Sequence, residues 1–535
     1  MIQEPRNVRV AFVGSGPGDP SLMTVRSREL LAEADVVVTD KIGGDAFVTA
    51  FARADVPVVD AGHGEHGEDL TRASRAKLVV AAATALPDGG LVVRLMDGDT
   101  AMFNGFAAEA LALRKAGIPF EVVPGVSAVT SVAMYAGVPL TSQQARTVHV
   151  VCLTDTPLDW RNAVDPSTTV VVLGQPHRLG GALEQIREAG ASAETPVAIV
   201  EHGTTTRQRT HVTTLGAGPA LIERCGVAAP CIAVVGATVE LRESLSWFES
   251  KPLFGWQVLV PRTKDQADRT IDRLARYGGR ATVVPTISVE PPRTPQQMER
   301  AVTGLVTGRY EWIGFTSVNA VRAVREKFQE YGLDARAMAG LRIAAVGGTT
   351  AAALRDWGLE PDLVPMGEQS TAGLLAEWPD YDPQCDPIDR VFLPRADIAT
   401  DTLVAGLVEL GWAVDDVTAY RTVRAAPPPA HIREAIKGGA FDAVVFTSSS
   451  TVRNLVGIAG KPHPNTVVAC IGPQTAKTAE EHGLRVDVLA PEASADALVD
   501  ALAAHGAVRA LDAAQHGEPL VRPSQRRASA RRRAR

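Results

Sequence analysis

The sequence predicts an α/β protein built from parallel sheets, and three features of the 535-residue chain support this prediction. Short apolar runs alternate with segments of helical spacing, and the loops between them are rich in glycine and proline. The first run, within Val8–Pro20, ends in a glycine-rich turn. The second half repeats its own strand-and-helix blocks, which indicates two similar lobes.

The composition is that of an ordinary globular protein, with 45% hydrophobic and 21% charged residues. The length leaves room for roughly two to four domains. The sequence shows no apolar run long enough to span a membrane and no signal-peptide layout at its start, so we expect no membrane contact. The five cysteines show no spacing typical of a metal site or a disulfide, so we expect a cytoplasmic protein without a bound metal.

The charge is distributed unevenly along the chain. The segment Arg522–Arg535 contains seven arginines and no acidic residue, although the net charge of the chain is −7. The rest of the chain is therefore strongly acidic, which is unusual for a nucleic-acid-binding protein. We expect residues 507–535 to form a disordered basic tail and the protein to have no nucleic-acid partner.

Strand, turn and helix units follow one another through the first half of the chain. Glycines at 14, 16 and 18 allow the backbone to approach a bound molecule closely, although a plain tight turn is the alternative. Asp40 directly follows a predicted strand, and the carboxyl ends of parallel strands face the ligand crevice in open sheets. A helix cap is the alternative role for Asp40. The other strands are expected at 35–39, 91–95 and 120–123, and the helices at 22–34, 70–85 and 105–116.

Five ordered motifs within residues 8–250 carry a family resemblance. They read VGSGPGDP, ADVVVTD, VVRLMDGD, AGIPFEVVPGVSA and YAGVPLT. This series resembles the uroporphyrinogen-III C-methyltransferases of the tetrapyrrole methylase family. The resemblance implies a two-lobed α/β domain over residues 1–252, usually a homodimer, that binds S-adenosylmethionine between its lobes. It implies cofactor contacts from Pro17, Asp97, Gly98, Asp99, Met102, Ser127, Ala128, Leu173 and Gly203.

The resemblance also implies a catalytic role for Asp40. Methylation of a pyrrole carbon requires proton handling, for which Asp40 would be the base or the orienting carboxylate. His63 stands where the family has a lysine, and is a candidate proton donor or a surface residue. The chain also departs from the family at Met96–Thr100, in place of Lys-Gly-Gly-Asp-Pro, and at Asn104–Phe106, in place of Gly-Arg-Gly. The loss of lysine and arginine weakens the attraction for a polycarboxylate substrate.

The second half contains an internal duplication that is visible in the residues alone. Residues 256–279 recur as 389–412, and two further strand-and-helix blocks recur in the same order. Proline-rich segments at 289–292 and 424–429 are typical of crossings between lobes. Two crossings imply that one lobe is inserted in the other. The predicted domain covers 256–506, with lobe one at 256–289 plus 428–506 and lobe two at 290–423.

The motifs VLVPRT, GFTSVNAV, VTAYRTV, FTSSSTV and IGPQTA stand in this order along the second half. They resemble uroporphyrinogen-III synthase, which implies two flavodoxin-like parallel-sheet lobes and hydroxymethylbilane as the substrate. Tyr420 matches the family's cleft tyrosine and would assist the departure of the hydroxyl group, although a packing aromatic is the alternative. Hydroxyl groups and arginines suit the substrate's carboxylates, but they also cap helices and sheet edges. These candidates are Arg262, Thr316, Ser317, Arg395, Thr447, Ser448 and Thr475.

The two resemblances together predict a bifunctional enzyme of tetrapyrrole biosynthesis, acting on the route to sirohaem or cobalamin. Its C-terminal half would cyclise hydroxymethylbilane with inversion of the last ring, and its N-terminal half would methylate the product to precorrin-2. One alternative is an active synthase that carries a degenerate methyltransferase half, as the departures at Met96, Thr100 and His63 suggest. Another is a non-enzymatic two-lobed ligand sensor.

Overall fold

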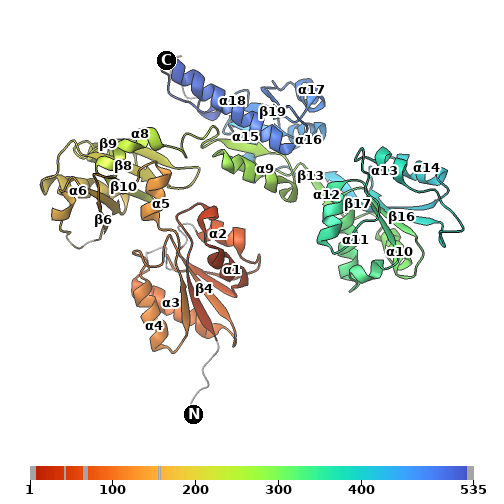
Figure 1. Cartoon of the computed structure of the whole chain (residues 1–535), viewed down its shortest axis with the longest axis horizontal. Coiled ribbons are helices and arrows are strands. Elements are labelled where there is room, and N and C mark those ends of the chain that lie inside the picture. Colours follow the sequence, from red (N-terminus) through yellow and green to blue (C-terminus); the bar gives the residue numbers. More distant parts are fainter. Residues whose placement is uncertain (1–7, 41–43, 64–69, 155, 157, 527–535) are drawn as a thin grey trace, which may run out of the picture. The chain divides into compact units, whose positions relative to one another are not determined.

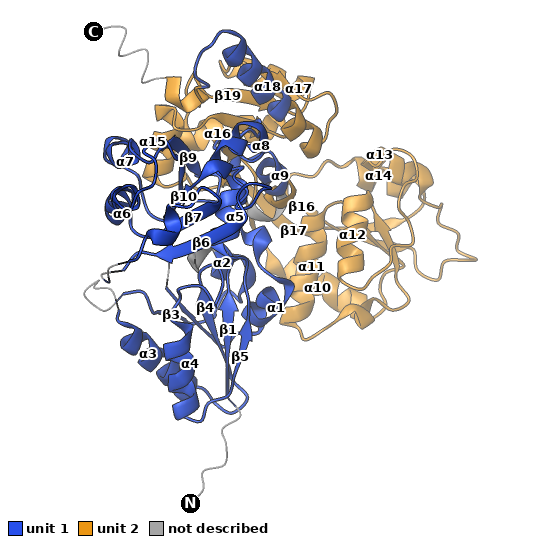
Figure 2. Ribbon diagram, turned by 60° about the vertical axis from the view of Figure 1, so that its left-hand side comes forward, with its two compact units in different colours: residues 1–257, 271–280, 502–520 blue, residues 258–270, 281–501, 521–535 orange. Residues whose placement is uncertain are grey.

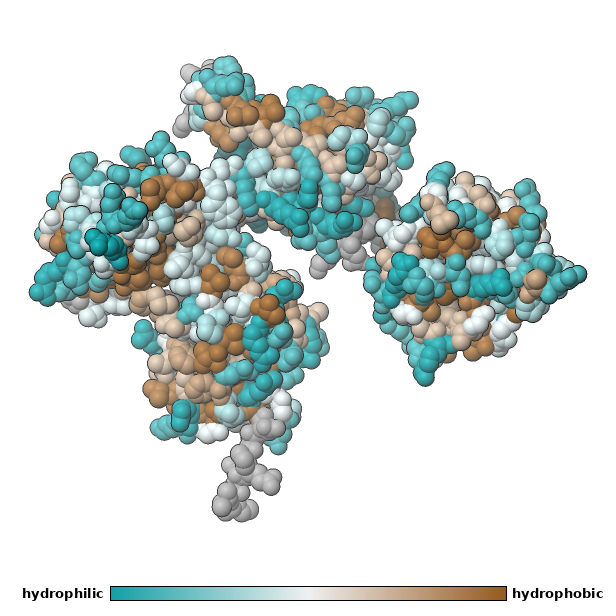
Figure 3. Space-filling model, in the orientation of Figure 1, coloured by the Kyte–Doolittle hydropathy of each residue, from teal (hydrophilic) through white to brown (hydrophobic). Residues whose placement is uncertain are grey.

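The chain folds into two compact units that together contain four five-stranded sheets (Figures 1 and 2). The computed structural model describes residues 8–40, 44–63, 70–154, 156 and 158–526. Unit 1 comprises Met1–Gln257, Ile271–Arg280 and Leu502–Leu520, and unit 2 comprises Val258–Thr270, Ala281–Ala501 and Val521–Arg535. Hydrophilic residues lie beside hydrophobic ones on the visible face of both units (Figure 3). Among the residues described, no helix has the length and apolar character needed to cross a membrane.

The first sheet of unit 1 is parallel and has the strand order β3-β2-β4-β1-β5. Its central strands are buried because their sequences are apolar apart from Arg9 and Arg94, and the ring of Phe12 packs edge-on against Phe106 and Phe120. The strands and helices predicted for this region are confirmed within a few residues, whereas α2 and β3 were not predicted. The elements are β1 (Arg9–Gly14), α1 (Val25–Glu33), β2 (Val36–Thr39), α2 (Gly44–Phe51), β3 (Val58–Asp60), α3 (Arg72–Ala85), β4 (Leu91–Met96), α4 (Phe106–Lys115) and β5 (Phe120–Val123).

The second sheet of unit 1 has the order β6-β7-β10-β8-β9 and is mixed. Only the β6–β7 pair is parallel, so the expectation of a parallel sheet is wrong for this lobe. The short connection between β8 and β9 accounts for their antiparallel pairing, because antiparallel neighbours need no crossover helix. Strand β10 runs antiparallel between β7 and β8. The elements are α5 (Ala128–Tyr135), β6 (Thr147–Cys152), β7 (Thr168–Leu173), α6 (Pro176–Glu188), β8 (Pro196–Glu201), β9 (Arg209–Thr214), α7 (Gly218–Cys225), β10 (Cys231–Val235) and α8 (Arg242–Leu245).

The third sheet has the order β12-β11-β18-β19-β20, which is the flavodoxin-like order 2-1-3-4-5. The parallel pairing of β11 with β18 joins two segments that are far apart in the chain, as the predicted insertion requires. The elements of this lobe one are β11 (Gln257–Val260), α9 (Lys264–Arg276), β12 (Arg280–Val283), α15 (Ala430–Gly438), β18 (Ala443–Phe446), α16 (Ser449–Ala459), β19 (Val467–Cys470), α17 (Pro473–Glu481), β20 (Val488–Leu489) and α18 (Ala495–Gln515).

The fourth sheet repeats this arrangement with the order β13-β17-β16-β14-β15. Its strands β14 to β17 are parallel, and β13 pairs antiparallel with β17 at the segment predicted to connect the lobes. The predicted duplication of an α/β lobe is thereby confirmed. The elements of lobe two are β13 (Ile287–Glu290), α10 (Pro295–Val306), β14 (Trp312–Phe315), α11 (Val318–Glu330), β15 (Arg342–Ala345), α12 (Gly348–Asp356), α13 (Thr371–Glu377), β16 (Arg390–Ala396), α14 (Thr402–Glu409) and β17 (Ala413–Arg424).

The C-terminal segment differs from the disordered tail expected over 507–535. Helix α18 continues to Gln515, and the chain is described as far as Arg526. Pro523 is buried, the backbone N–H of Ser524 donates to the buried carboxylate of Asp442 at 2.9 Å, and Arg522 lies 3.8 Å from the same carboxylate. The expectation of disorder is therefore wrong for 507–526, because the segment begins within α18 and its last described residues contact Asp442. The expected disorder of 527–535 lies outside the described residues.

Candidate active sites

A cavity of about 650 Å³ in unit 1 is lined by loops from both of its sheets. All nine residues predicted to contact the cofactor line this one cavity, although they come from five separate segments of the chain. They are Pro17, Asp97, Gly98, Asp99, Met102, Ser127, Ala128, Leu173 and Gly203. The cavity therefore brings together backbone groups, carboxylates, a hydroxyl and apolar side chains, as recognition of a small polar molecule requires.

Glycines allow three strand-end loops of the first sheet to meet beside this cavity. Gly16 and Gly98 exchange backbone hydrogen bonds of 3.1 and 2.9 Å. A Cβ atom at Gly125 would lie 2.1 Å from the carbonyl oxygen of Gly98, so only glycine fits there. The close approach leaves the backbone itself as part of the cavity wall.

The acidic loop at the end of β4 is held by its own side chains. The carboxylate of Asp99 accepts hydrogen bonds from the backbone N–H of Gly125 at 2.9 Å and of Ala101 at 2.8 Å. The amide of Asn104 donates to the carbonyl oxygens of Asp97 and Asp99. Asn104, where the sequence departs from the expected glycine, therefore fixes the shape of this loop.

Backbone strain is concentrated at the cavity. Phe103 and His202, which line it, have φ angles of 62° and 46°, and the neighbouring Thr204 has 64°. Non-glycine residues with such angles persist where the surrounding structure holds them, often at functional sites. The Nδ1 atom of His202 is buried and makes no hydrogen bond within the described part of the chain. Burial and, secondarily, the charge of Arg207 lower the pKa of His202, so its ring is neutral at physiological pH.

Asp40 belongs to a buried ion-pair cluster at the carboxyl edge of the first sheet. The Nη2 atom of Arg94 donates to both oxygens of Asp40, at 2.9 and 3.0 Å, and Nε of Arg94 donates to Glu109 at 2.7 Å. Burial alone would lower the pKa of Arg94, but Glu109 and Asp40 raise it above its ordinary value. Of the two roles predicted for Asp40, this arrangement favours the orienting one, because its oxygens already accept two hydrogen bonds.

His63 stands apart from this cluster. Its half-exposed ring lies 3.8 Å from the carboxylate of Asp60, and neither His63 nor Asp40 lines the cavity. Asp40 and His63 follow the adjacent strands β2 and β3, so they share one edge of the sheet. A catalytic role for His63 stays a prediction.

Tyr420 and Ser317, both predicted to serve the second site, are in contact. Their hydroxyl oxygens lie 2.9 Å apart in lobe two. Tyr420 lies within β17, which continues beyond it to Arg424. Its ring is buried, with 7% of its surface exposed, and its hydroxyl points to the cap of helix α11.

The paired arginines of the duplication have different surroundings. Arg395 is buried and donates to the carboxylate of Asp416 and the carbonyl oxygen of Thr400, which favours the edge-capping alternative. Arg262 makes no side-chain hydrogen bond or ion pair with any described residue, and burial lowers its pKa. Of the two, Arg262 is the better candidate to bind a substrate carboxylate.

The remaining candidates follow the carboxyl ends of strands in both lobes, β14 in lobe two and β18 and β19 in lobe one. Thr316 precedes Ser317 after β14, and Thr447 and Ser448 follow β18. Ser448 caps α16 through a hydrogen bond of 3.2 Å from the backbone N–H of Thr451, and Thr475 is buried in the first turn of α17. Capping is thus an observed role of Ser317 and Ser448, and substrate contact by these hydroxyls stays a prediction.

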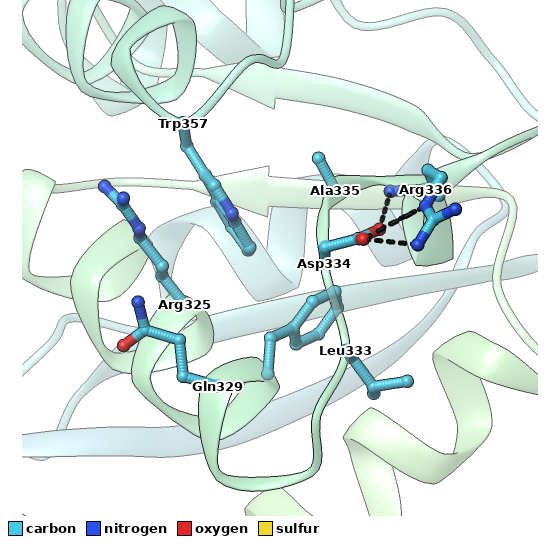
Figure 4. Close-up of a pocket in the computed structure, with 8 residues that line it drawn as sticks. Arg325, Gln329, Leu333, Asp334, Ala335, Arg336 and Trp357 are labelled. Atoms are coloured by element: carbon cyan, nitrogen blue, oxygen red, sulfur yellow. Dashed lines mark hydrogen bonds and ion pairs between the residues drawn. The ribbon is translucent and has the colours of Figure 1, made fainter. Parts of the chain in front are cut away.

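Another cavity, of about 440 Å³, lies in lobe two and contains none of the predicted residues (Figure 4). Its lining includes the edge-to-face pair Phe328 and Trp357. Asp334 and Arg336, which also line it, pair with each other (Figure 4). The described residues contain no group of three or more His, Cys, Asp and Glu side chains that could hold a metal ion.

Four residues of these sites were not predicted from the sequence: Arg94, Glu109, Phe103 and His202. Arg94 had a detectable signal, because a lone arginine in the apolar run LVVRLM requires a buried acidic partner. The sequence carries no signal that identifies Glu109 as this partner, and none for the left-handed backbone of Phe103 and His202. These features depend on the tertiary arrangement.

Comparisons with known proteins assign both halves of the chain. Residues 9–218 match the model of the tetrapyrrole (corrin/porphyrin) methylases, and residues 268–500 match that of uroporphyrinogen-III synthase HemD. A native uroporphyrin III C-methyl transferase structure from Thermus thermophilus is 30% identical with a TM-score of 0.37, covering 44% of this chain and 99% of that one. The siroheme synthase of Methylobacillus flagellatus is 39% identical over 251 residues, which are 45% of this chain and 52% of that protein. The chain thus spans about half the length of that synthase.

One relative matches nearly the whole chain. The porphyrin biosynthesis protein HemD of Ruminiclostridium josui is 30% identical over 507 residues, which cover 92% of this chain and 97% of that protein. The predicted fusion is confirmed by these matches. The chain belongs to the family of this porphyrin biosynthesis protein, and it carries a tetrapyrrole methylase followed by a uroporphyrinogen-III synthase.

Proposed function

We propose that the synthase half cyclises hydroxymethylbilane to uroporphyrinogen III with inversion of ring D, and that the methylase half converts this product to precorrin-2 with S-adenosylmethionine. The observation that carries the proposal is the single cavity lined by all nine predicted cofactor residues. The family matches to both halves support it.

The cavity residues fit S-adenosylmethionine. A volume of about 650 Å³, a wall of glycine backbone and the buried Nδ1 atom of His202 suit a polar ligand with several hydrogen-bonding groups. Leu173, Met102 and Ala128 add apolar contacts. When bound there, S-adenosylmethionine supplies an electrophilic methyl group. The carboxylate of Asp40, held by Arg94, would orient the acceptor ring.

In the synthase half, Tyr420 would donate a hydrogen bond or a proton to the leaving hydroxyl of hydroxymethylbilane. Ser317 would orient the phenol, and Arg262 would bind a substrate carboxylate. The reaction requires a folded linear substrate and little covalent chemistry by the enzyme, so positioning is the main task of this half.

The decisive experiment supplies hydroxymethylbilane with and without S-adenosylmethionine, separates the ring isomers and measures product mass. We expect type III isomer in both samples and two added methyl groups only with the cofactor. Asp40→Asn is expected to keep isomer formation and lose methyl transfer. Type I isomer alone would refute the synthase role. If calorimetry detected no heat of S-adenosylmethionine binding, the methylase half would be degenerate.

We also propose that the enzyme acts in the cytoplasm as a homodimer formed through the methylase half, without a nucleic-acid partner. All five cysteines are free thiols, which supports a reducing compartment. The methylase half exposes Leu245 and Trp247, each with 46% of its surface accessible, which suits an interface. Light scattering of the purified chain tests the dimer.

A further inference from the structure

Two arginines stand at the start of helix α3, where positive charge is unfavourable. Thr71 caps this helix, Arg72 is its first residue, and Arg75 lies in the next turn. The first turn contains no acidic residue that would offset them. Because the N-terminus of a helix repels cations, a role outside the helix best explains this pair.

Arg72 lies beside the margin of the cofactor cavity. Its side-chain carbons pack over Gly105, 3.7 Å from where a Cβ atom would be, and the neighbouring Asn104 lines the cavity. The charge of Arg72 also acts on Cys152 at the end of β6, where it opposes the burial that raises the pKa of the thiol. Cys152 is in register with the cavity residue Leu173. The Arg72 side chain thus lies beside the loop that carries Asn104, and its charge reaches the end of β6.

Arg72 has no hydrogen-bond or ion-pair partner among the residues that the structure describes. Arg75 is incompletely paired: its Nη1 atom lies 4.0 Å from Asp40, and its buried Nε atom makes no hydrogen bond with the described residues. The better-placed Arg94 already satisfies Asp40 and Glu109. The two α3 arginines therefore retain donors for a further anionic group beside Asp40.

We propose that Arg72 and Arg75 bind carboxylate side chains of the methyl acceptor and hold its ring beside Asp40. This inference rests on the proposed methyl transfer to a polycarboxylate tetrapyrrole. Guanidinium groups suit this task because they bind carboxylates with two parallel hydrogen bonds. Both residues lie outside the set of lining residues of the cofactor cavity, so their predicted effect is on the acceptor and not on the cofactor.

The test measures binding of uroporphyrin III, a stable octacarboxylate, by fluorescence titration of the full chain, and KM for uroporphyrinogen III in methyl transfer. Arg72→Met and Arg75→Met are each expected to weaken binding and raise KM about tenfold, and the double variant about a hundredfold. Arg72→Lys and Arg75→Lys should recover part of the loss, because they keep the charge. The affinity for S-adenosylmethionine, measured by calorimetry, should be unchanged.

Arg114→Met is the matched control. Arg114 is an exposed arginine in the last turn of α4, and its side chain has no hydrogen-bond or ion-pair partner in the described structure. This variant should change neither the binding of uroporphyrin III nor the KM for uroporphyrinogen III. Unchanged uroporphyrin III binding in both α3 methionine variants would overturn the inference, as would a parallel loss of cofactor affinity. If the unaltered chain transferred no methyl group, the proposed function would fail, whereas the titration would still decide this inference.

Discussion

The hydroxyl of Ser317 lies 2.9 Å from the phenol oxygen of Tyr420 and joins the cap of α11 to strand β17. Ser317 is fixed in place because its oxygen also accepts a hydrogen bond of 3.1 Å from the backbone N–H of Ala320. A capping serine on rigid backbone can therefore orient the phenol. This contact links the best catalytic candidate of the synthase half to one of its predicted substrate residues.

Tyr420→Phe is expected to lower the rate of type III isomer formation about 100-fold, because it removes the proposed proton donor. Ser317→Ala should have a smaller effect, since it removes only the group that orients the phenol. Isomer separation after timed reaction with hydroxymethylbilane measures both rates. Methyl transfer to supplied uroporphyrinogen III should be unchanged in both variants.

Tyr310→Phe is the matched control for this comparison. Tyr310 is also a buried tyrosine of lobe two, and its hydroxyl donates to Asp415 at 2.8 Å. Its replacement should lower the free energy of unfolding by about 1 kcal/mol and leave the cyclisation rate intact. An equal loss of cyclisation rate in the Tyr310 and Tyr420 variants would mean that Tyr420 contributes only by packing and not as a proton donor.

Gly203→Ala is expected to weaken S-adenosylmethionine binding at least about tenfold and to destabilise the fold by about 1–3 kcal/mol. The added Cβ would lie 2.3 Å from Cγ1 of Val132, a short and stiff side chain. Val132→Ala in the same chain should restore part of both losses by removing the clash. Calorimetry measures the affinity for S-adenosylmethionine, and urea unfolding measures the stability, of the single and double variants.

Gly181→Ala provides the control for this pair of substitutions. Gly181 lies within α6 and has no positive φ, and no atom of the described residues lies within 4 Å of an added Cβ. Alanine there should leave cofactor binding unchanged and stabilise the fold slightly. If Gly203→Ala behaved in the same way, the region of Gly203 would not contribute to the cofactor site.

Cofactor affinity is expected to fall in acid through His202. Its pKa lies below the ordinary histidine value because of burial and the charge of Arg207, so the folded chain takes up this proton at a lower pH than an ordinary histidine does. A protonated ring would then repel the cationic sulfonium of S-adenosylmethionine. In the same range the unfolded chain takes up the proton first, so stability also decreases as the pH falls.

His202→Asn tests this assignment, because asparagine tolerates the φ of 46° and cannot take up a proton. Calorimetric titration between pH 5 and pH 8 should show a smaller loss of affinity in acid for this variant than for the unaltered chain. Identical pH profiles would exclude His202 as the titrating group.

The sequence predicted the parts of the fold and site that depend on local pattern. Apolar runs predicted β1, β4 and β5, and the duplicated blocks predicted two similar lobes. The family motifs led to nine residues that share one cavity. The mixed second sheet was missed because antiparallel pairing is decided between strands and not within them. The partners of Asp40 were missed for the same reason, since Arg94 and Glu109 meet it only after the sheet has formed.

The C-terminal segment shows the same limit and leads to the last prediction. Its arginine-rich composition is typical of disorder, yet Ser524 and Arg522 reach the carboxylate of Asp442, a residue with 0% of its surface exposed. Removing residues 521–535 should lower the free energy of unfolding of the synthase half by about 1–3 kcal/mol, because a buried carboxylate loses a hydrogen bond and a nearby cation.

A shorter truncation separates this contact from the effect of the remaining arginines. Removing only residues 527–535 keeps Arg522, Pro523 and Ser524, and should leave stability unchanged. Urea unfolding of the two truncations, followed by the tryptophan fluorescence of the chain, makes the comparison. Equal stability would show that the contact with Asp442 contributes nothing, whereas a loss confined to the longer truncation identifies the end of the chain as part of the synthase fold. Because Asp442 immediately precedes β18, whose other end leads to Thr447 and Ser448, such a loss should also raise KM for hydroxymethylbilane.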